Sequence, residues 1–380
     1  MTVSIWQAED TQPVREVDVL VVGAGLVGCT AAYFFGQAGR QVTITEMRDV
    51  ALGASSRNAG FMITGLETYY HRAVEMYGHD VTREVWALSH KTHGYWREFA
   101  KAGSVRISNC GSMLLAQSDE ERDEIELAAR AMRADGYDVV FHDTDPLRRG
   151  FCAAVEQPWD AAVQPYELVQ TIFRLSGAEL VDNNELYRFE QTGETVTVYT
   201  RQYRFVARTV LLCTNAYSVH IHPYFVGKVI PTRAQALVTA PLKESPLVNT
   251  CGYGDYGYMY FRDTFDGRLL IGGGRKFYKE LENDTTDDRV TEPVQRHLDA
   301  YLKQFFPDID VPVERRWAGI MGFTPDGLPL VGKLPGMSRV GFCIACHGHG
   351  LSLGAGSAER AVDLMLNDTD PGTFHASRLH

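Results

Sequence analysis

The apolar positions near the start of the chain predict a strand, a helix and a second strand in quick succession. The run Asp18–Val22 is apolar after its first residue and ends in a glycine-rich turn, which is typical of a buried parallel strand. Residues 26–38 carry small and apolar side chains at helical spacing up to Gly39, and Gln41–Glu46 is rich in β-forming residues. This order, within about thirty residues, predicts a βαβ unit with a right-handed crossover.

The rest of the chain alternates between amphipathic helical patterns and stretches with a period of two. The expected helices cover residues 68–102, 120–133, 165–175, 287–306 and 352–366. Residues 185–212 are expected to form an antiparallel meander that leads into a buried strand, and β-rich stretches follow at 229–275 and 341–345. We find no internal repeat and no low-complexity linker.

Segments typical of a nucleotide-binding fold stand at the start, middle and end of the chain. We therefore expect an α/β protein in which a discontinuous βαβ nucleotide domain is interleaved with an α+β substrate domain whose sheet is mostly antiparallel. The expected boundaries are 14–80, 158–228 and 312–380 for the first domain, and 81–157 and 229–311 for the second.

Length and charge narrow the classes of function. The chain has 380 residues, more than one hydrophobic core usually serves, and its net charge of −11 argues against nucleic-acid binding. No run approaches the roughly 20 apolar residues of a membrane span, and residues 1–16 lack the apolar core of a secretory signal. Among the seven scattered cysteines, Cys343 and Cys346 lie in an apolar segment that is more typical of a buried strand than of a redox turn. These features favour the reducing cytoplasm, and we expect no metal site.

The sequence between the first strand and the first helix fits the dinucleotide-binding pattern G-x-G-x-x-G. Gly23 permits a tight turn, Gly25 lets the backbone approach a pyrophosphate, and Gly28 lets the helix pack closely on the sheet. Glu46 ends the second strand, where an acidic side chain accepts hydrogen bonds from a ribose 2′-hydroxyl. The glycines, both strands and the acid together predict a bound dinucleotide without a 2′-phosphate.

The segment Gly53–Gly60 follows the ribose-binding strand and is small, polar and bounded by glycines. Its hydroxyl and amide groups suit a second phosphate or a ribityl chain. From the residues alone, a plain surface loop is an equally good interpretation.

Several segments together resemble the D-amino-acid oxidase superfamily of FAD-dependent oxidoreductases. The resemblance covers nearly the whole chain and rests on Gly23–Gly28, Gly53–Gly60, Val210–Ala216, Phe323–Gly332 and Gly348–Gly354. With Ile5-Trp6 near the start and Gly348–Ser352 near the end, the chain looks most similar to the γ-glutamylputrescine oxidase branch of a superfamily that includes glycine oxidase and monomeric sarcosine oxidase. The resemblance implies FAD as the cofactor of the nucleotide domain.

The resemblance also implies where the cofactor is held. It places Ser55, Ser56, Arg57 and Asn58 beside the flavin and its ribityl-phosphate side, Thr214 and Asn215 near the adenine half, and Gly348, Gly350, Leu351 and Ser352 at the pyrimidine edge of the isoalloxazine. A glycine-rich loop that opens a helix suits this edge, because its amides and the positive helix end face the negative charge of a reduced flavin. His347 and His349 are candidate catalytic residues, or loop histidines without a chemical task.

Three positions depart from relatives. Gly319 stands where monomeric sarcosine oxidase has the cysteine that tethers its flavin, so we expect non-covalent FAD. Met321 stands where glycine oxidase has an arginine that grips the substrate carboxylate, so the usual bidentate clamp is missing. Leu270 replaces the sarcosine oxidase lysine that helps reaction with O2, but glycine oxidase also lacks that lysine. Oxidase and dehydrogenase therefore both stay open.

An aromatic segment, Tyr253–Arg262, is the candidate substrate wall. If it is one strand, alternation puts Tyr256, Tyr258 and Tyr260 on one face, where an amine could meet the rings through cation–π attraction. By resemblance to glycine oxidase, Tyr258 is the candidate catalytic residue. Sheet packing or a second subunit explains such a segment equally well, and Arg262 and Arg275 are either carboxylate partners or exposed charges.

These observations favour an FAD-dependent oxidoreductase for a primary or secondary amine or an amino-acid derivative. The substrate would lose a hydride to flavin N5, the imine would hydrolyse, and O2 or another acceptor would reoxidise the flavin, with O2 as the favoured acceptor. The alternatives are an FAD-dependent 2-hydroxy-acid dehydrogenase with His347 or His349 as base, a flavoprotein with a binding or nucleic-acid-modifying role, and a protein that retains FAD without turnover. Substrate and oligomeric state stay open.

Overall fold

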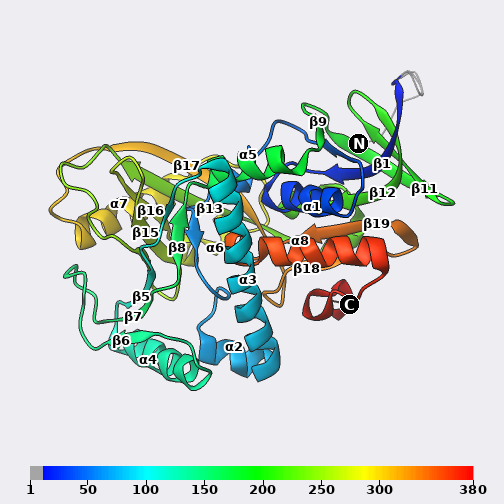
Figure 1. Cartoon of the computed structure of the whole chain (residues 1–380). Coiled ribbons are helices and arrows are strands. Elements are labelled where there is room, and N and C mark those ends of the chain that lie inside the picture. Colours follow the sequence, from blue (N-terminus) through cyan, green and yellow to red (C-terminus); the bar gives the residue numbers. More distant parts are fainter. Residues whose placement is uncertain (1–11, 380) are drawn as a thin grey trace. The chain divides into compact units, whose positions relative to one another are not determined.

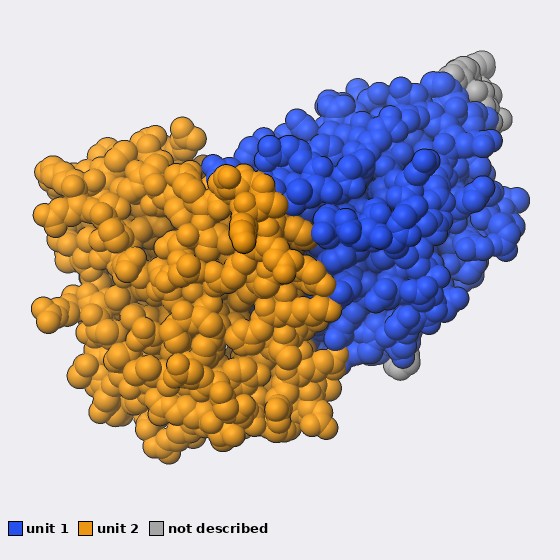
Figure 2. All heavy atoms as spheres, in the orientation of Figure 1, with its two compact units in different colours: residues 1–56, 166–230, 322–380 blue, residues 57–165, 231–321 orange. Residues whose placement is uncertain are grey.

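The computed structural model describes residues 12–379 (Figure 1), so the Ile5-Trp6 pair lies outside the described part of the chain. The chain divides into two compact units, which Figure 2 colours separately. The first comprises residues 1–56, 166–230 and 322–380, and the second comprises residues 57–165 and 231–321. Residues 57–80, 158–165 and 312–321, which we expected in the nucleotide domain, thus belong to the second unit.

The first unit is built on an eight-stranded sheet with a parallel centre. The order β10-β11-β12-β1-β2-β9 forms its main path, and β19 pairs with β12 and with β18. The strands are β1 (Val14–Val22), β2 (Val42–Thr45), β9 (Glu179–Val181), β10 (Leu186–Thr192), β11 (Thr195–Thr200), β12 (Arg204–Leu212), β18 (Leu330–Leu334) and β19 (Met337–Ile344). Strands β9, β2, β1, β12 and β19 run parallel, while β10, β11 and β18 join by antiparallel pairing.

The carboxyl ends of the central strands lie in register. Val22 is the partner of both Leu212 and Thr45, and Leu212 is in turn the partner of Phe342. The residues that follow β1, β2, β12 and β19 therefore emerge at one edge of the sheet, which is where open α/β sheets bind their ligands. The helices of this unit are α1 (Leu26–Gln37), α5 (Pro165–Ser176) and α8 (Gly350–Asn367), and α8 packs on α1.

The second unit contains an eight-stranded, mostly antiparallel sheet, as expected. Its order is β17-β13-β16-β15-β14-β5-β7-β6, in which β14 and β5 form a parallel pair. The strands are β5 (Ser112–Ala116), β6 (Val140–His142), β7 (Ala153–Gln157), β13 (Ile230–Thr239), β14 (Cys251–Gly254), β15 (Met259–Asp263), β16 (Leu269–Gly273) and β17 (Val313–Phe323). The expected fold class, α/β with a second α+β part, is confirmed.

A three-stranded sheet explains why residues 57–80 and 158–165 belong to the second unit. Strand β8 (Ala161–Val163) pairs with both β3 (Phe61–Met62) and β4 (Ile107–Ser108), and this pairing ties residues 57–80 to the rest of the unit. The helices of the unit are α2 (Tyr70–Tyr77), α3 (His79–Gly103), α4 (Asp119–Ala134), α6 (Lys279–Glu282) and α7 (Glu292–Phe305).

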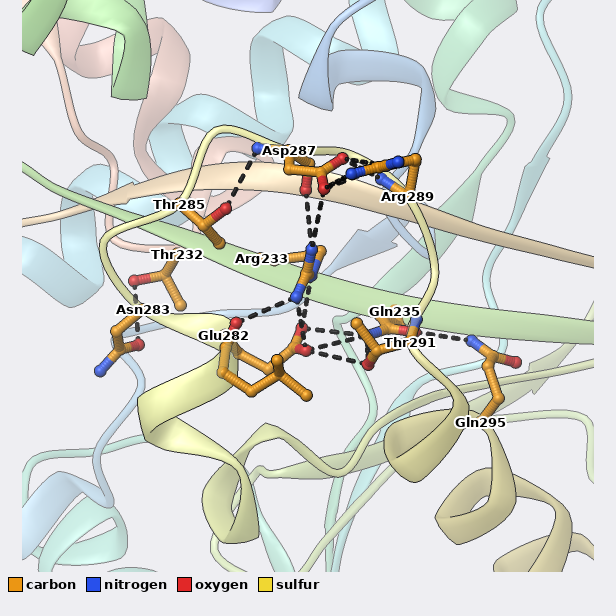
Figure 3. Close-up of polar contacts among 11 residues, drawn as sticks. Thr232, Arg233, Gln235, Glu282, Asn283, Thr285, Asp287, Arg289, Thr291 and Gln295 are labelled. Atoms are coloured by element: carbon orange, nitrogen blue, oxygen red, sulfur yellow. Dashed lines mark hydrogen bonds and ion pairs between the residues drawn. The ribbon is translucent and has the colours of Figure 1, made fainter.

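Two helix predictions need correction. The expected helix over 68–102 is two helices, because Gly78 adopts a φ of +84° between α2 and α3. The helix expected from residue 287 begins only at Glu292, because buried side chains of β13 capture the preceding segment (Figure 3). Arg233 binds the Asp287 carbonyl (3.1 Å), and the Thr291 amide donates to the Gln235 side chain (2.9 Å).

Candidate functional site

The turn between β1 and α1 has room for glycine alone at two positions. Gly23 has a φ of +106°, and a Cβ there would lie 2.7 Å from the Cys213 carbonyl oxygen. A Cβ at Gly28 would lie 1.9 Å from the Gly23 carbonyl oxygen. Because Gly28 brings α1 this close to the strand end, the helix begins at the edge of the sheet where a pyrophosphate would bind.

Two side chains from the next segments are fixed to this turn. The Glu46 carboxylate accepts hydrogen bonds from the Ala24 amide (2.8 Å) and the Arg48 amide (3.0 Å), one to each oxygen. Each oxygen keeps a second lone pair for a ribose hydroxyl. The Ser55 hydroxyl accepts from the Leu26 amide (2.8 Å), so this predicted cofactor residue lies at the N-terminal end of α1. Glu46 and Ser55 therefore both bind backbone amides of the glycine turn and the start of α1, and their contacts with the cofactor stay predictions.

The remaining residues of the Ser55–Asn58 segment have other neighbours. Ser56 ends a short 3₁₀ helix, Ala54–Ser56, and is the last residue of the first unit in this segment. Arg57 forms an ion pair with Asp288 and donates to the Ala318 carbonyl (3.0 Å). Asn58 accepts from the amide two residues further on (2.8 Å), which closes a local turn. The contacts of Arg57 and Asn58 thus hold the protein chain itself together.

Gly319 lies against Arg57. A Cβ at Gly319 would approach the Arg57 Cβ to 3.0 Å, and the neighbouring Trp317 ring nitrogen donates to the Arg57 carbonyl (2.8 Å). The backbone here is therefore packed too closely for a side chain to enter without displacement. Glycine, which offers no atom for a covalent tether, suits this position.

The middle and last segments of the first unit meet at Gly322. A Cβ there would lie 2.7 Å from the Asn215 side-chain oxygen, and the Gly322 carbonyl accepts from the His347 amide (3.2 Å). Asn215 begins the 3₁₀ helix Asn215–His220 with a φ of +45°, and Thr214 shares a hydrogen bond with Ser218 (2.8 Å). The predicted adenine-side turn and the loop before α8 are thus brought together.

The two loop histidines make defined hydrogen bonds. His347 Nδ1 accepts from the Thr324 amide (3.3 Å), and the Phe323 ring lies 4.1 Å from its ring. His349, 7% exposed, is the N-cap of α8, and its Nδ1 lies 3.1 Å from the His347 carbonyl. A carbonyl only accepts, so His349 Nδ1 carries a proton. The structure therefore gives Nδ1 of each histidine a backbone partner.

The start of α8 completes the loop that we expected at the flavin edge. Gly348 has a φ of +77°, which a residue with a side chain rarely adopts, and Gly350 begins the helix. Leu351 and Ser352 are buried in its first turn, and the Ser352 amide donates to the His349 carbonyl (3.0 Å). The N-terminal end of α8, which we predicted to face the flavin, therefore lies in the first unit.

The aromatic segment is a hairpin, so the prediction of one strand with three tyrosines on one face is wrong. Strand β14 ends at Gly254 and β15 begins at Met259. Tyr256 lies in the turn with a φ of +55°, and Gly257 follows with a φ of +83°. Positive φ angles reverse the chain, which places Tyr253 opposite Tyr260 in the ladder, with their rings 5.9 Å apart.

The three tyrosines therefore have different surroundings. The Tyr256 amide donates to Glu121 (2.6 Å), and its side chain is 37% exposed. The Tyr258 ring already faces a cation of the chain, because the Arg275 guanidinium lies 4.7 Å from its centre. Burial raises the pKa of the Tyr260 hydroxyl to about 12. An amine bound at Tyr258 would thus share the ring with Arg275.

Arg262 is the most unusual substrate candidate. It is 5% exposed, donates from Nη2 to the Val163 carbonyl (3.2 Å), and its Nε and Nη1 have no partner within residues 12–379. Burial lowers the pKa of this guanidinium. Phe265 lies under it at 5.2 Å. A buried cation with two free donors is costly unless an anion or water completes it. Met321, by contrast, is a partly buried residue of β17.

Sequence reasoning missed a buried polar network in the second unit (Figure 3). The side chains of Arg233 and Glu282 are 4% and 1% exposed and form two hydrogen bonds of 3.0 Å. Gln235 donates to Glu282 (3.0 Å) and Thr291 (2.7 Å). The network fixes the segment that carries Asp288, the partner of Arg57. No local pattern signals it, because its members are separated by about fifty residues.

Metal binding and membrane spanning find no support in the described part of the chain. Within residues 12–379, no three His, Cys, Asp or Glu side chains are arranged to hold a metal ion. No helix in that range is long and apolar enough to cross a membrane.

This chain is similar to known proteins over most of its length. The family model described as "FAD dependent oxidoreductase" matches residues 18–364. The chain is 24% identical to a probable oxidoreductase OrdL of Rhizobium meliloti, over 93% of this chain and 83% of that protein. It is 23% identical to gamma-glutamylputrescine oxidoreductase of Escherichia coli, over 93% and 84%. Its structure matches glycine oxidase from Geobacillus kaustophilus with a TM-score of 0.81 at 20% identity, over 96% and 99%.

Proposed function

Because this chain belongs to the FAD-dependent oxidoreductase family, we propose that it oxidises a C–N bond in a small primary or secondary amine or amino-acid derivative. When bound, FAD supplies the hydride acceptor, N5, and passes the electrons on to O2 or another acceptor. The imine product leaves and hydrolyses. The observation that carries the proposal is the glycine turn, whose Ala24 amide donates to the Glu46 carboxylate. The chain that contains it is similar to two enzymes named for amine substrates, glycine oxidase and gamma-glutamylputrescine oxidoreductase.

The chain's own residues have defined tasks in this proposal. The amides at the start of α1 bind the pyrophosphate, and Glu46, held by two backbone amides, binds the ribose hydroxyls. The start of α8 directs amides and its positive end toward the pyrimidine edge. Gly319 leaves the FAD non-covalent, so denaturation should release all flavin from the protein.

Arg262 supports a substrate that carries a carboxylate. Its unpartnered Nε and Nη1 point to different sides of the guanidinium, and a carboxylate oxygen that accepts from either one would compensate the buried charge. Arg262 would supply a carboxylate contact in place of the arginine that glycine oxidase has where this chain has Met321. Tyr258 remains the proposed contact for the amine, and Tyr256 and Tyr260 are assigned to the surrounding wall.

A 2-hydroxy acid would satisfy Arg262 equally well, so the reacting group decides between the two classes. Hydroxyl oxidation needs a base for the hydroxyl proton. His347 Nδ1 accepts from the Thr324 amide, so in the neutral ring Nε2 carries the proton and the one lone pair is already engaged. The His349 ring is buried, with its Nδ1 on the His347 carbonyl. The amine reaction needs neither, since a deprotonated amine transfers hydride without a further base.

Anaerobic reduction of the bound flavin tests the proposal. The purified holoprotein is mixed with primary and secondary amines, polyamines, N-methyl amino acids and 2-hydroxy acids, and the loss of flavin absorbance is recorded. We expect bleaching by at least one amine and by no hydroxy acid. Peroxide release in air then separates an oxidase from a dehydrogenase.

Two outcomes would contradict the proposal. Bleaching by hydroxy acids alone would favour the dehydrogenase reading, with His349 as the base to mutate. Bleaching by no compound, although dithionite reduces the flavin, would favour a protein that holds FAD without turnover.

A further inference from the structure

Two cysteines from distant parts of the sequence face each other in the second unit. Cys110 lies between β4 and β5, and Cys251 is the first residue of β14. Their sulfur atoms are 3.9 Å apart. The parallel pairing of β14 with β5 sets this distance, because Cys251 is the register partner of Ser112 and its amide donates to the Gly111 carbonyl (3.2 Å). A disulfide needs a sulfur separation of about 2.05 Å, so modest side-chain rotation would suffice.

The two sulfurs have different surroundings. Cys251 is fully buried, and its sulfur lies 3.6 Å from the Ala161 carbonyl oxygen of β8. Cys110 is only partly buried, so it is the more exposed of the two. Arg262 donates to the Val163 carbonyl, two residues along the same strand, and its positive charge acts on both sulfurs. One sulfur is therefore the more exposed and lies near a cation, and the other is shielded behind it.

Ionisation follows the same asymmetry. The hydrogen bond from Cys251, with help from Ser108 and the charge of Arg262, lowers the pKa of Cys110 to about 6. Burial, together with the hydrogen bond to Cys110, keeps the pKa of Cys251 well above its usual range. The nearby Asp160 carboxyl is buried, and burial raises its pKa to about 7. A thiolate beside a protonated thiol is the arrangement that oxidising enzymes use for disulfide formation.

The other five cysteines lack this combination. In the first unit, burial raises the pKa of four thiols: Cys29, Cys213, Cys343 and Cys346. The C-x-x-C pair that drew notice in the sequence is among them, and both of its members are buried. Cys152 is partly buried and serves as a comparison of similar exposure.

We propose that Cys110 and Cys251 form a peroxide-responsive dithiol, in which Cys110 is oxidised first and Cys251 resolves it as a disulfide. The Cys110 thiolate attacks hydrogen peroxide, which breaks the O–O bond, gives the sulfenic acid and releases hydroxide. The Cys251 sulfur then forms the S–S bond, and the sulfenic oxygen leaves as water with the Cys251 thiol proton. Two electrons pass from the two sulfurs to peroxide, which ends as two molecules of water once the hydroxide takes up the proton that Cys110 released on ionising.

This modification site is independent of the amine reaction. Hydrogen peroxide is the by-product of any flavin oxidase that uses O2, so such an enzyme would meet it at high local concentration. Formation of the disulfide also removes the thiolate charge that faces Arg262. The test below supplies the oxidant directly and adds no amine, so its result does not depend on the proposed function.

The experiment uses fully reduced holoprotein treated with hydrogen peroxide, quenched with an alkylating reagent and analysed by peptide mass spectrometry without reduction. We expect a cross-linked peptide joining Cys110 to Cys251, while the four buried cysteines of the first unit stay alkylatable after unfolding. The variant Cys251→Ser should accumulate sulfenic acid at Cys110, trapped by dimedone. Cys110→Ser should leave Cys251 as a thiol, and Cys152→Ser should form the disulfide like the parent.

A pH profile gives an independent readout that needs no variant. The alkylation rate of Cys110 in the folded protein should rise with a midpoint near pH 6 and level off, and Arg262→Gln should move that midpoint upward. The proposal fails if peroxide oxidises Cys152 before Cys110, if Cys110 forms its disulfide with another cysteine, or if Cys110→Ser leaves Cys251 equally oxidisable.

Discussion

Replacing Gly28 with alanine tests whether the close approach of α1 to the strand end holds the cofactor. The added Cβ would lie 1.9 Å from the Gly23 carbonyl oxygen and 3.3 Å from the Cys213 Cβ. An ordinary carbon–oxygen contact is about 3.3 Å or more, so α1 must move away by roughly 1.4 Å. Both contacting groups belong to the sheet edge or its turn, and the closer one is backbone, so no side-chain rotation relieves the clash. Overpacking of this kind costs about 1–3 kcal/mol.

The cost should fall on FAD binding, because the same movement withdraws the α1 amides from the pyrophosphate. At about 1.4 kcal/mol for each factor of ten, we expect FAD affinity to fall by roughly 5- to 150-fold. Titration of the apoprotein with FAD, followed by flavin fluorescence, measures this change. Gly94→Ala is the matched control, since Gly94 lies within α3 with nothing within 4 Å of an added Cβ. It should keep FAD affinity and gain about 0.5–1 kcal/mol of stability. A Gly28→Ala protein that binds FAD like the parent would refute the reasoning.

Three further predictions concern the second unit. Asp160 is buried, which raises its pKa to about 7, above an unfolded value of about 4. Its contribution to the free energy of unfolding is therefore complete below pH 4 and is lost as the pH rises to about 7. Asp160→Asn should remove this pH dependence from urea unfolding curves measured across the range. Arg233→Met should cost about 3–5 kcal/mol of unfolding free energy, because it leaves Glu282 buried and unpaired. The double variant Arg233→Met, Glu282→Leu should recover most of this loss. An unchanged urea midpoint in the single variant would contradict the assigned network. Arg262→Gln should raise KM for carboxylate-bearing amines by about 30-fold or more. The control Arg106→Gln also removes a guanidinium from the Phe265 ring and should leave KM unchanged. Equal effects of the two variants would assign Arg262 a purely structural role.

The sequence predicted the nucleotide-binding part of the fold well, and the comparisons confirm the family and FAD as its cofactor. An apolar strand, a glycine turn and a small-residue helix are local signals, and each is decided within a few residues. Glu46 could be assigned to the end of the second strand for the same reason, whereas Ser55 was singled out only by the resemblance to the family. The assignment of individual residues to flavin and substrate remains a prediction.

What the sequence did not predict depends on contacts between distant segments. Tyr256 looked like part of one strand because aromatic residues favour strands, whereas positive φ angles at the turn make a hairpin. The unpartnered nitrogens of Arg262 follow from burial, which no local pattern reveals. Cys110 and Cys251 are separated by 141 positions, so no local pattern connects them. The more visible C-x-x-C pair is buried, as its apolar neighbours indicated.

The packing of α8 on α1 has a consequence for how the protein is made. Helix α1 ends at Gln37 and α8 begins at Gly350, so about 310 residues must be added before the two can meet. At about 5–20 residues per second, a ribosome needs roughly 15–60 s for this stretch. Throughout that time the helix that carries the glycine turn lacks its final neighbour, and β12 lacks β19. This edge of the sheet is therefore completed only after α8 has been made, and until then β12 exposes an unpaired strand edge of the kind that promotes aggregation.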